Sequence, residues 1–286
     1  MAFIANGLLS VLPSSSFSIL ARHTNVSLST AGMIFTVASL GTIAAIMVSN
    51  PFVQRIGAKY VLMAGLAGLI TASLVIPTTP VFNLWLVAQF LQGSSSSLIN
   101  VGLTMILTLN FHEELGEKLN TLYGTYGIGA LLAPILLSFS LSSTGNALSA
   151  FLPIPLLSGI CLLLLYIIEF RSKPDQQESA AQDNPAEASV SLGKILHQSL
   201  LWLVVLQVCL YTGTESGFSN WLVTSLSQSA AIALQKATPA ASFFWLGLTS
   251  GRLLLAQFMK RGMLQDKRLL YISFIGGGIF GMLVTT

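Results

Sequence analysis

The sequence predicts an all-α integral membrane protein with several spanning helices. Its 286 residues are 53% hydrophobic and only 8% charged, and the mean hydropathy is +0.77. Soluble domains carry about 25% charged residues, so this chain has too few charges to cover a globular surface. The apolar runs are long and continuous, which favours helices over a barrel. A soluble enzyme is excluded, and 13 scattered basic residues are too few for nucleic-acid binding.

Nine segments of the chain are long and apolar enough to cross a bilayer, which takes about 20 residues in a helix. They are roughly 2–20, 30–50, 60–77, 81–109, 120–141, 147–169, 197–225, 239–259 and 269–286. The first segment has no basic residues before it, and Pro13 with the three serines after it makes a poor cleavage site. We therefore expect this segment to be a spanning helix rather than a signal peptide.

Residue types that hold metals and cofactors are scarce. Cys161 and Cys209 both lie in predicted spans, and His23, His112 and His197 fall at span ends or in loops without forming a cluster. The sequence therefore predicts neither a disulfide framework nor a metal or cofactor site. An integral membrane enzyme is not expected either, because no catalytic set of His, Asp or Cys gathers near one membrane face.

Basic residues are unevenly divided between the loops on the two sides of the predicted bundle. The loops 51–59, 110–119, 170–196 and 260–268 hold ten of the 13 Lys and Arg residues, and the opposite loops hold Arg22 and Lys236. The positive-inside rule places the N-terminus in the cytoplasm of a multi-pass protein of the plasma or inner membrane. Segment 171–196 is polar, acidic and contains prolines, so we expect a flexible cytoplasmic linker there.

The order of elements repeats along the chain. A shift of 210 residues places segment 39–42 on 249–252 and the span 60–77 on 270–286. Two halves related by duplication are typical of parallel-repeat transporters. We therefore expect a six-helix N-terminal bundle in 1–170, the linker 171–196 and a partial C-terminal bundle in 197–286. Because Met1 falls on Tyr211 under this shift, we expect helix 1 to be short by about ten residues. The second half has three predicted spans where the first has six, so we expect it to be short by about three helices.

The loop between the second and third spans resembles a motif of the major facilitator superfamily. Arg55, Gly57 and Lys59 match the family pattern G-x-x-x-D-R/K-x-G-x-R/K, whereas Asn50 and Gln54 replace its first glycine and its acid. In the family that acid latches helices across the inner gate. The resemblance thus implies a gating loop at Arg55, Gly57 and Lys59 in which the latch is altered.

Three further segments carry the same resemblance, which covers essentially the whole chain. The glycine-rich segment 123–134 with its final proline is similar to the family's fifth helix, and segments 211–221 and 242–252 are similar to the fucose–proton symporters and related sugar permeases. The resemblance implies a helical bundle of about nine present spans, six and three of an expected six and six. Those relatives place acids on helices 1 and 4, where this chain has Asn6 and amides. Either the coupling has moved to Glu215, or the protein is not proton-coupled.

Two charged residues lie deep within the predicted spans, Glu215 and Arg252. A charge at bilayer depth costs several kcal/mol, so such residues are functional candidates. Glu215 shares a helix face with Gln207 and Tyr211, which predicts that this face lines an aqueous cavity. We expect Glu215 to bind the solute or a coupling proton; the alternative is a carboxyl that bonds a neighbouring helix. Arg252 is either a solute contact or a structural, gating arginine.

Neutral polar residues form a stripe along the fourth predicted span. Gln89, Gln92, Ser96, Asn100 and Thr104 are spaced by three or four residues, so they share one helix face. Amide side chains offer both donors and acceptors to hydroxyl-rich ligands. We predict that Gln89, Gln92 and Asn100 contact a solute. The run of Gly93 and the four serines 94–97 could instead mark close helix packing.

Aromatic residues also fall near the presumed cavity, at Tyr123, Tyr126, Tyr211, Trp221 and Trp245. A flat aromatic face suits the C–H surface of a sugar ring. However, Trp and Tyr also gather at the membrane interfaces, near the ends of spans. Each of these aromatic residues could therefore be an interfacial residue instead of a solute contact. Tyr123 and Tyr211 are retained as candidate solute contacts.

These features predict a secondary active transporter that moves a small polar solute, a sugar among the candidates, by alternating access. Its expected partners are the solute, the lipid bilayer and, if transport is coupled through Glu215, protons. The alternative is a truncated, transport-inactive relative or fragment that acts only as a membrane partner protein.

Overall fold

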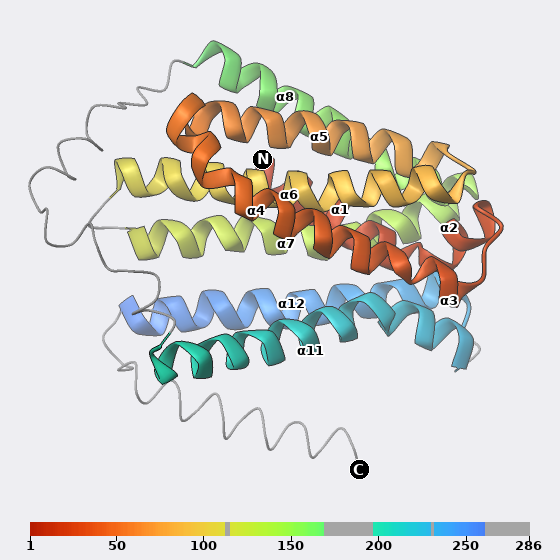
Figure 1. Cartoon of the computed structure of the whole chain (residues 1–286). Coiled ribbons are helices and arrows are strands. Elements are labelled where there is room, and N and C mark those ends of the chain that lie inside the picture. The colour runs from red at the N-terminus through yellow and green to blue at the C-terminus, as the bar shows by residue number, and fades with distance from the viewer. Residues whose placement is uncertain (112–114, 169–196, 230–231, 261–286) are drawn as a thin grey trace, which may run out of the picture.

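The computed structural model describes residues 1–111, 115–168, 197–229 and 232–260 (Figure 1). Within these ranges all regular elements are helices. In chain order they are α1 (Ala2–Ser15), α2 (Phe17–His23), α3 (Leu28–Ala31), α4 (Met33–Ile56), α5 (Ala58–Thr78), α6 (Phe82–Asn110), α7 (Leu115–Thr144), the 3-10 helix η1 (Ala147–Phe151), α8 (Pro153–Ile167), α11 (Ser199–Ser229) and α12 (Leu234–Lys260).

The helices coincide with eight of the nine predicted spans, which confirms the all-helical membrane fold. The ninth predicted span, 269–286, and the predicted linker 171–196 lie outside the described residues. Length and apolar composition mark Leu28–Ile56, Ala58–Thr78, Lys118–Thr144 and Ala147–Ile167 as able to cross a membrane, and also α1 with α2 if they form one span. Helices α6, α11 and α12 are more polar than these spans, so the question is what their polar residues face.

The first predicted span is one broken helix rather than a straight one. α1 and α2 meet at a bend of 69° next to Ser16. Pro13 has no backbone N–H to bond the preceding turn, so it weakens the helix there. Near the bend, the Ser14 hydroxyl donates to the Val11 oxygen at 2.9 Å, and the Leu12 oxygen accepts both the Ser16 hydroxyl at 2.6 Å and the Ser16 backbone N–H at 2.9 Å.

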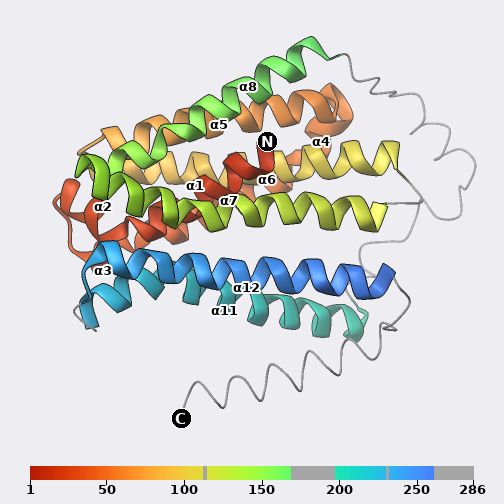
Figure 2. The ribbon, with the colours of Figure 1, turned by 180° about the vertical axis from the view of Figure 1, so that it is seen from behind.

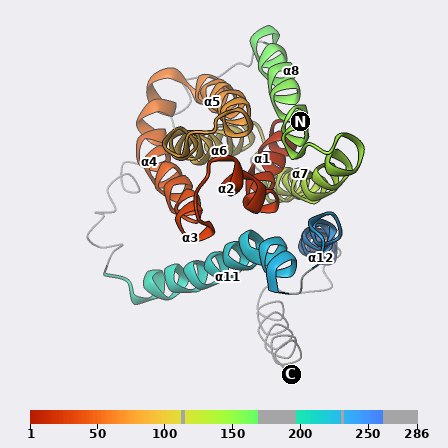
Figure 3. The same cartoon turned by 90° about the vertical axis from the view of Figure 1, so that its right-hand side faces the viewer.

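Helices α1 to α8, together with η1, pack as one group, with α11 and α12 along one side of it (Figure 3). α1 is buried along nearly its whole length, and it contacts α5, α6, α7, α8 and α11. α6 lies against both α4 and α5. Figure 2 shows α7 and α12 side by side, and this pair makes the main contact between the two parts.

Glycines bring the helix backbones together at several crossings. A Cβ on Gly7 or Gly129 would collide with backbone atoms where α1 crosses α7, and one on Gly93 would collide with Ala38 where α4 crosses α6. On α7, Gly127 meets the side chain of Thr249 on α12. The glycines of α7 thus allow α1 and α12 to approach it closely, as small residues do in membrane helices.

Candidate functional site

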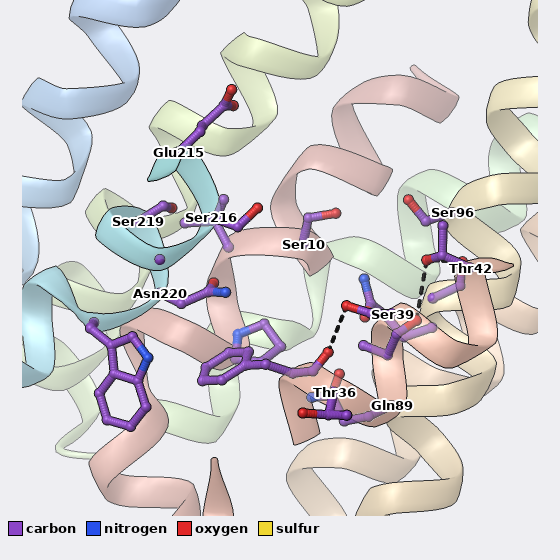
Figure 4. Close-up of a pocket in the computed structure, with 18 of the residues that line it drawn as sticks. Ser10, Thr36, Ser39, Thr42, Gln89, Ser96, Glu215, Ser216, Ser219 and Asn220 are labelled. Carbon is purple, nitrogen blue, oxygen red and sulfur yellow. Dashed lines mark hydrogen bonds between the residues drawn. The ribbon is translucent and has the colours of Figure 1, made fainter. Parts of the chain in front are cut away.

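A cavity of about 500 Å³ lies between α1, α4, α6 and α7 on one side and α11 and α12 on the other (Figure 4). This volume falls in the range of small-molecule sites. It is lined by Ser10, Val11, Pro13, Phe35, Thr36, Ala38, Ser39, Thr42, Gln89, Gln92, Gly93, Ser96, Tyr126, Glu215, Ser216, Gly217, Ser219, Asn220, Trp221 and Trp245.

Helical periodicity explains why these residues meet. On α4, Phe35, Ser39 and Thr42 recur every three or four residues and therefore share one face. Gln89, Gln92 and Ser96 do the same on α6. The polar residues of α6 from Gln89 to Ser96 and those of α11 from Glu215 to Asn220 thus border the cavity.

The lining is polar but carries little charge. Hydroxyls and amides come from five helices, and aromatic rings come from Phe35, Tyr126, Trp221 and Trp245. Among the described lining residues Glu215 is the only charged one. Such a surface can bind an uncharged solute through hydrogen bonds and ring contacts, and it offers no cation to an anionic solute.

Several hydroxyls in the wall use their protons for carbonyls of their own or a neighbouring helix. Ser10 donates to the Asn6 carbonyl at 2.8 Å, and Ser39 to the Phe35 carbonyl at 2.9 Å. Thr42 donates to the Ala38 and Gly93 carbonyls, both at 3.2 Å. Because a hydroxyl has one proton and two lone pairs, these groups can still accept hydrogen bonds. The α1 and α4 side of the cavity therefore presents mainly acceptors.

An aromatic cluster of Phe17, Phe35 and Trp221 lies at the end of the cavity next to α2 and α3. The Phe17 ring centroid is 5.3 Å from that of Phe35 and 5.4 Å from that of Trp221, and the Phe35 and Trp221 centroids are 6.1 Å apart. Trp221 also lies against Gly32, at 3.6 Å from the position of a Cβ there. The cluster joins α2 and α4 to α11 and covers this end.

Away from this cluster the helices separate. α4 and α11 lie near each other at the α3 end and diverge toward the end where α4 leads into α5 (Figures 1 and 3). The side chains of Trp202, Leu206 and Leu210 on α11 are more than half exposed, at 56%, 57% and 64%. The residues of α11 that border the cavity therefore begin at Glu215, near the middle of this helix.

Three of the seven predicted solute contacts line the cavity, namely Gln89, Gln92 and Glu215. Asn100 and Tyr123 are not among its lining residues. Instead the Tyr123 hydroxyl donates to Asn100 Oδ1 at 3.4 Å, and Thr104 Oγ1 donates to the same oxygen at 3.3 Å. This network ties α7 to α6 one to two turns beyond the cavity.

The remaining predicted site residues lie elsewhere. Tyr211 is 47% exposed, one turn before Glu215, and is not in the lining. The side chain of Arg252 lies outside the described residues, although α12 carries its backbone. In the predicted gating loop, Gly57 joins α4 to α5 with φ 88°, Lys59 Nζ donates to the Ile168 carbonyl at 2.8 Å, and Arg55 is exposed.

Sequence reasoning missed the part of the lining contributed by small polar residues. These are Ser10 on α1, Thr36, Ser39 and Thr42 on α4, and Ser216, Ser219 and Asn220 on α11. The signal was present on α4, where three hydroxyl residues recur every third position inside an apolar span. Serine and threonine are common in membrane helices for packing reasons, so this pattern alone does not separate a cavity from a helix contact.

The fold and the site define the class of this protein, a multi-pass helical membrane protein with a polar cavity between two groups of helices. Comparison with known proteins identifies its family. The Major Facilitator Superfamily model matches residues 1–286. The chain belongs to this superfamily, as its motifs predicted. Membership points to a transporter rather than an enzyme.

Two relatives show the extent of the similarity. The chain is 23% identical over 261 residues to the uncharacterized MFS-type transporter YfkL of Bacillus subtilis (strain 168), covering 89% of this chain and 64% of that protein. It is 28% identical over 84 residues to the MFS-type transporter ppzB of Metarhizium rileyi (strain RCEF 4871), covering 29% of this chain and 17% of that one. The chain thus spans less than two thirds of the length of these relatives.

Proposed function

We propose that this protein is a secondary transporter that carries a small, uncharged, hydroxyl-rich solute, such as a sugar or polyol, by alternating access. The observation that carries this proposal is the cavity of about 500 Å³, whose described lining combines hydroxyls, amides and aromatic rings with a single charged residue. Membership of the superfamily supports the transport role.

The charge of the lining favours an uncharged solute over an anionic one. An anion would enter a low-dielectric space beside the Glu215 carboxylate, and like charges at close range repel strongly there. A sugar, by contrast, brings hydroxyls that donate to the acceptors of the α1 and α4 side and C–H faces that pack on aromatic rings. These interactions match what the wall offers.

The arrangement of the helices supports an inward-facing state in this proposal. The distribution of basic residues places the loop 51–59 and the segment 170–196 in the cytoplasm. The aromatic cluster would then close the outer end, and α4 and α11 diverge toward the cytoplasmic end (Figure 1). Transport would require the Phe17, Phe35 and Trp221 contacts to separate while the other end closes.

Within this cavity we assign Glu215 as the group that binds solute hydroxyls or a coupling proton. Uptake into proteoliposomes, measured for a panel of sugars and polyols with and without a pH gradient, tests this assignment. Glu215→Gln keeps the size of the side chain and removes its charge, so uptake should fall and lose its pH dependence. Glu114→Gln, in the predicted loop 110–119, is the matched control. Uptake by the Glu215 variant that equals the wild type at every pH would exclude the proton role.

A second candidate function is that of a membrane partner protein without transport activity. The observation that favours it is the exposed apolar surface of α11, which includes Trp202, Leu203 and Leu206. A chain that covers 64% of its relative could use this surface to bind another membrane helix. If the purified protein binds none of the panel solutes but co-purifies with a second membrane protein in stoichiometric amount, this function replaces the first.

A further inference from the structure

Two hydrogen-bond donors in the wall of the cavity are buried and have no partner among the described residues. They are Nε2 of Gln89 and Nε1 of Trp245. Both side chains are almost fully buried, at 3% and 5% exposed, and both residues line the cavity. Buried N–H groups in native proteins nearly always have a partner. A pair of unpaired donors at one cavity is therefore an observation that points to a ligand.

The two donors come from opposite walls of the site. Gln89 lies on α6 (Figure 4), and Trp245 lies on α12, which belongs to the group of helices on the other side. An acceptor-bearing solute that satisfied both would therefore touch both groups of helices. Contacts of this kind couple binding to the relative position of the two walls.

The Trp245 indole is held in place by its neighbours. Its ring packs edge-on against Tyr126 of α7 at 6.2 Å and against Phe244 at 5.5 Å between centroids. One turn before it, Ser242 Oγ donates to the Leu131 carbonyl of α7 at 3.0 Å and anchors α12 there. An indole held by two ring contacts on an anchored helix cannot turn its N–H to a new partner easily, so the partner has to come to it.

The donors complement the rest of the wall. Ser10, Ser39 and Thr42 keep their protons for helix carbonyls and can act only as acceptors toward the cavity. Glu215, when ionised, is likewise an acceptor. Gln89 and Trp245 supply N–H donors at the same cavity. A solute that fits this wall must both donate and accept hydrogen bonds, as hydroxyl groups do and as a quaternary ammonium ion does not.

We propose that Gln89 and Trp245 determine the specificity of the cavity for hydroxylated solutes, each by donating its N–H to an oxygen of the bound molecule. The proposal rests on the proposed function and deepens it, because it excludes an organic cation, which the lone carboxylate and the aromatic rings would otherwise suit.

The test measures binding to the 286-residue protein in lipid nanodiscs by isothermal titration calorimetry. D-Glucose, L-fucose and myo-inositol serve as hydroxylated probes, and tetraethylammonium serves as the cation. Trp245→Phe removes the N–H and keeps an aromatic ring, and Gln89→Met removes the amide at similar length. Each variant should weaken binding of the hydroxylated probe by about three- to tenfold, the effect of one lost hydrogen bond.

Trp85→Phe is the matched control. Trp85 is also fully buried and its Nε1 also lacks a partner among the described residues, but it does not line the cavity. The thermal midpoints of the two Trp→Phe variants without solute should shift alike, whereas only Trp245→Phe should lose affinity. If Trp245 had a merely structural role, Trp245→Phe would change the thermal midpoint but would leave the dissociation constant for the hydroxylated probe equal to that of the wild type.

The outcomes separate the inference from the function beneath it. If the wild type binds a hydroxylated probe and both variants bind it equally well, the donor role is wrong and the proposed function stands. If the wild type binds only tetraethylammonium, or none of the probes, both the inference and the uncharged hydroxylated solute are overturned.

Discussion

At the scale of single residues, the cavity separates the two roles that polar side chains can play in a membrane helix. Ser39 and Thr42 satisfy carbonyls of their own or a neighbouring helix and so remain compatible with an apolar span. Glu215 and Gln89 cannot be satisfied so simply, since a carboxylate and an amide need more partners. Both residues, which would be costly in lipid, border the cavity.

Tyr123 and Asn100 provide a test of residues that sequence reasoning placed in the site and the structure places beside it. Tyr123→Phe removes the hydroxyl that bonds Asn100 Oδ1 at 3.4 Å. Solute affinity should stay within twofold of the wild type, and the free energy of unfolding should fall by about 0.5–1.5 kcal/mol, the net worth of one hydrogen bond. Titration calorimetry and thermal unfolding measure the two quantities. A loss of affinity larger than tenfold would return Tyr123 to the binding site.

The absence of a side chain at Gly93 contributes to stability, and this contribution can be measured. A Cβ at this position would collide with the Ala38 carbonyl of α4. Gly93→Ala should therefore push α4 and α6 apart and lower the free energy of unfolding by about 1–3 kcal/mol, as overpacking does. The matched control is Gly159→Ala on α8, where a Cβ meets nothing within 4 Å. Thermal unfolding of both variants decides, and equal midpoints would mean that α4 and α6 can separate without cost.

At the scale of elements, the sequence predicted where helices lie far better than how they bend and face. Long apolar runs located eight helices because burial of backbone polar groups leaves no other spanning structure. The break between α1 and α2 follows Pro13, whose missing N–H weakens the helix, and hydrophobicity does not encode such a break.

The helical periodicity of the sequence predicted part of the candidate site for a physical reason. The stripe on α6 was visible because amides are rare in membrane helices, yet only its first part, Gln89 to Ser96, borders the cavity. Asn100 continues the same stripe but meets Tyr123 of α7 instead. Which part of a helix face meets a cavity depends on where neighbouring helices diverge, and that is a property of several elements together.

The contact between α2, α4 and α11 is the element-scale feature that can be opened by mutation. Trp221→Ala removes two ring contacts, which are worth about 0.5–1.5 kcal/mol each, and should favour a state open at the α3 end by roughly tenfold. With Cys161 and Cys209 changed to serine, Ser39→Cys reports opening through its rate of reaction with a membrane-impermeant maleimide added outside. This rate should rise about tenfold with Trp221→Ala.

Phe82→Ala is the control for that measurement, because the Phe82 ring contacts the Trp85 ring within α6 and is not part of the aromatic cluster of Phe17, Phe35 and Trp221. It should leave the labelling rate of Ser39→Cys unchanged. An equal rise in both variants would indicate general loosening, and no rise with Trp221→Ala would show that the aromatic cluster does not close this end.

At the scale of the whole molecule, polarity in three places follows one arrangement. Arg55 and Lys59, where α4 leads into α5, and Lys118 at the start of α7 lie at one end of the described bundle (Figure 1), the aromatic cluster lies at the other, and the polar cavity lies between them on the contact surface of the two groups of helices. A carrier needs these three features in this order: an anchored orientation, a separable contact and a site that both sides share. The orientation decides which side of the membrane the aromatic cluster closes and to which side the cavity opens.

Two exposed positions at opposite ends of the bundle test that orientation. Gln54 lies in the last turn of α4 beside the basic loop, and Ser29 lies in α3 near the aromatic cluster. In a background without Cys161 and Cys209, Gln54→Cys should react with an impermeant maleimide only in inside-out vesicles, and Ser29→Cys only in right-side-out ones, because the positive-inside rule predicts that the end with the ten basic residues faces the cytoplasm. The reverse pattern would place the aromatic cluster at the cytoplasmic face, and the closed end of the cavity would then be its inner gate.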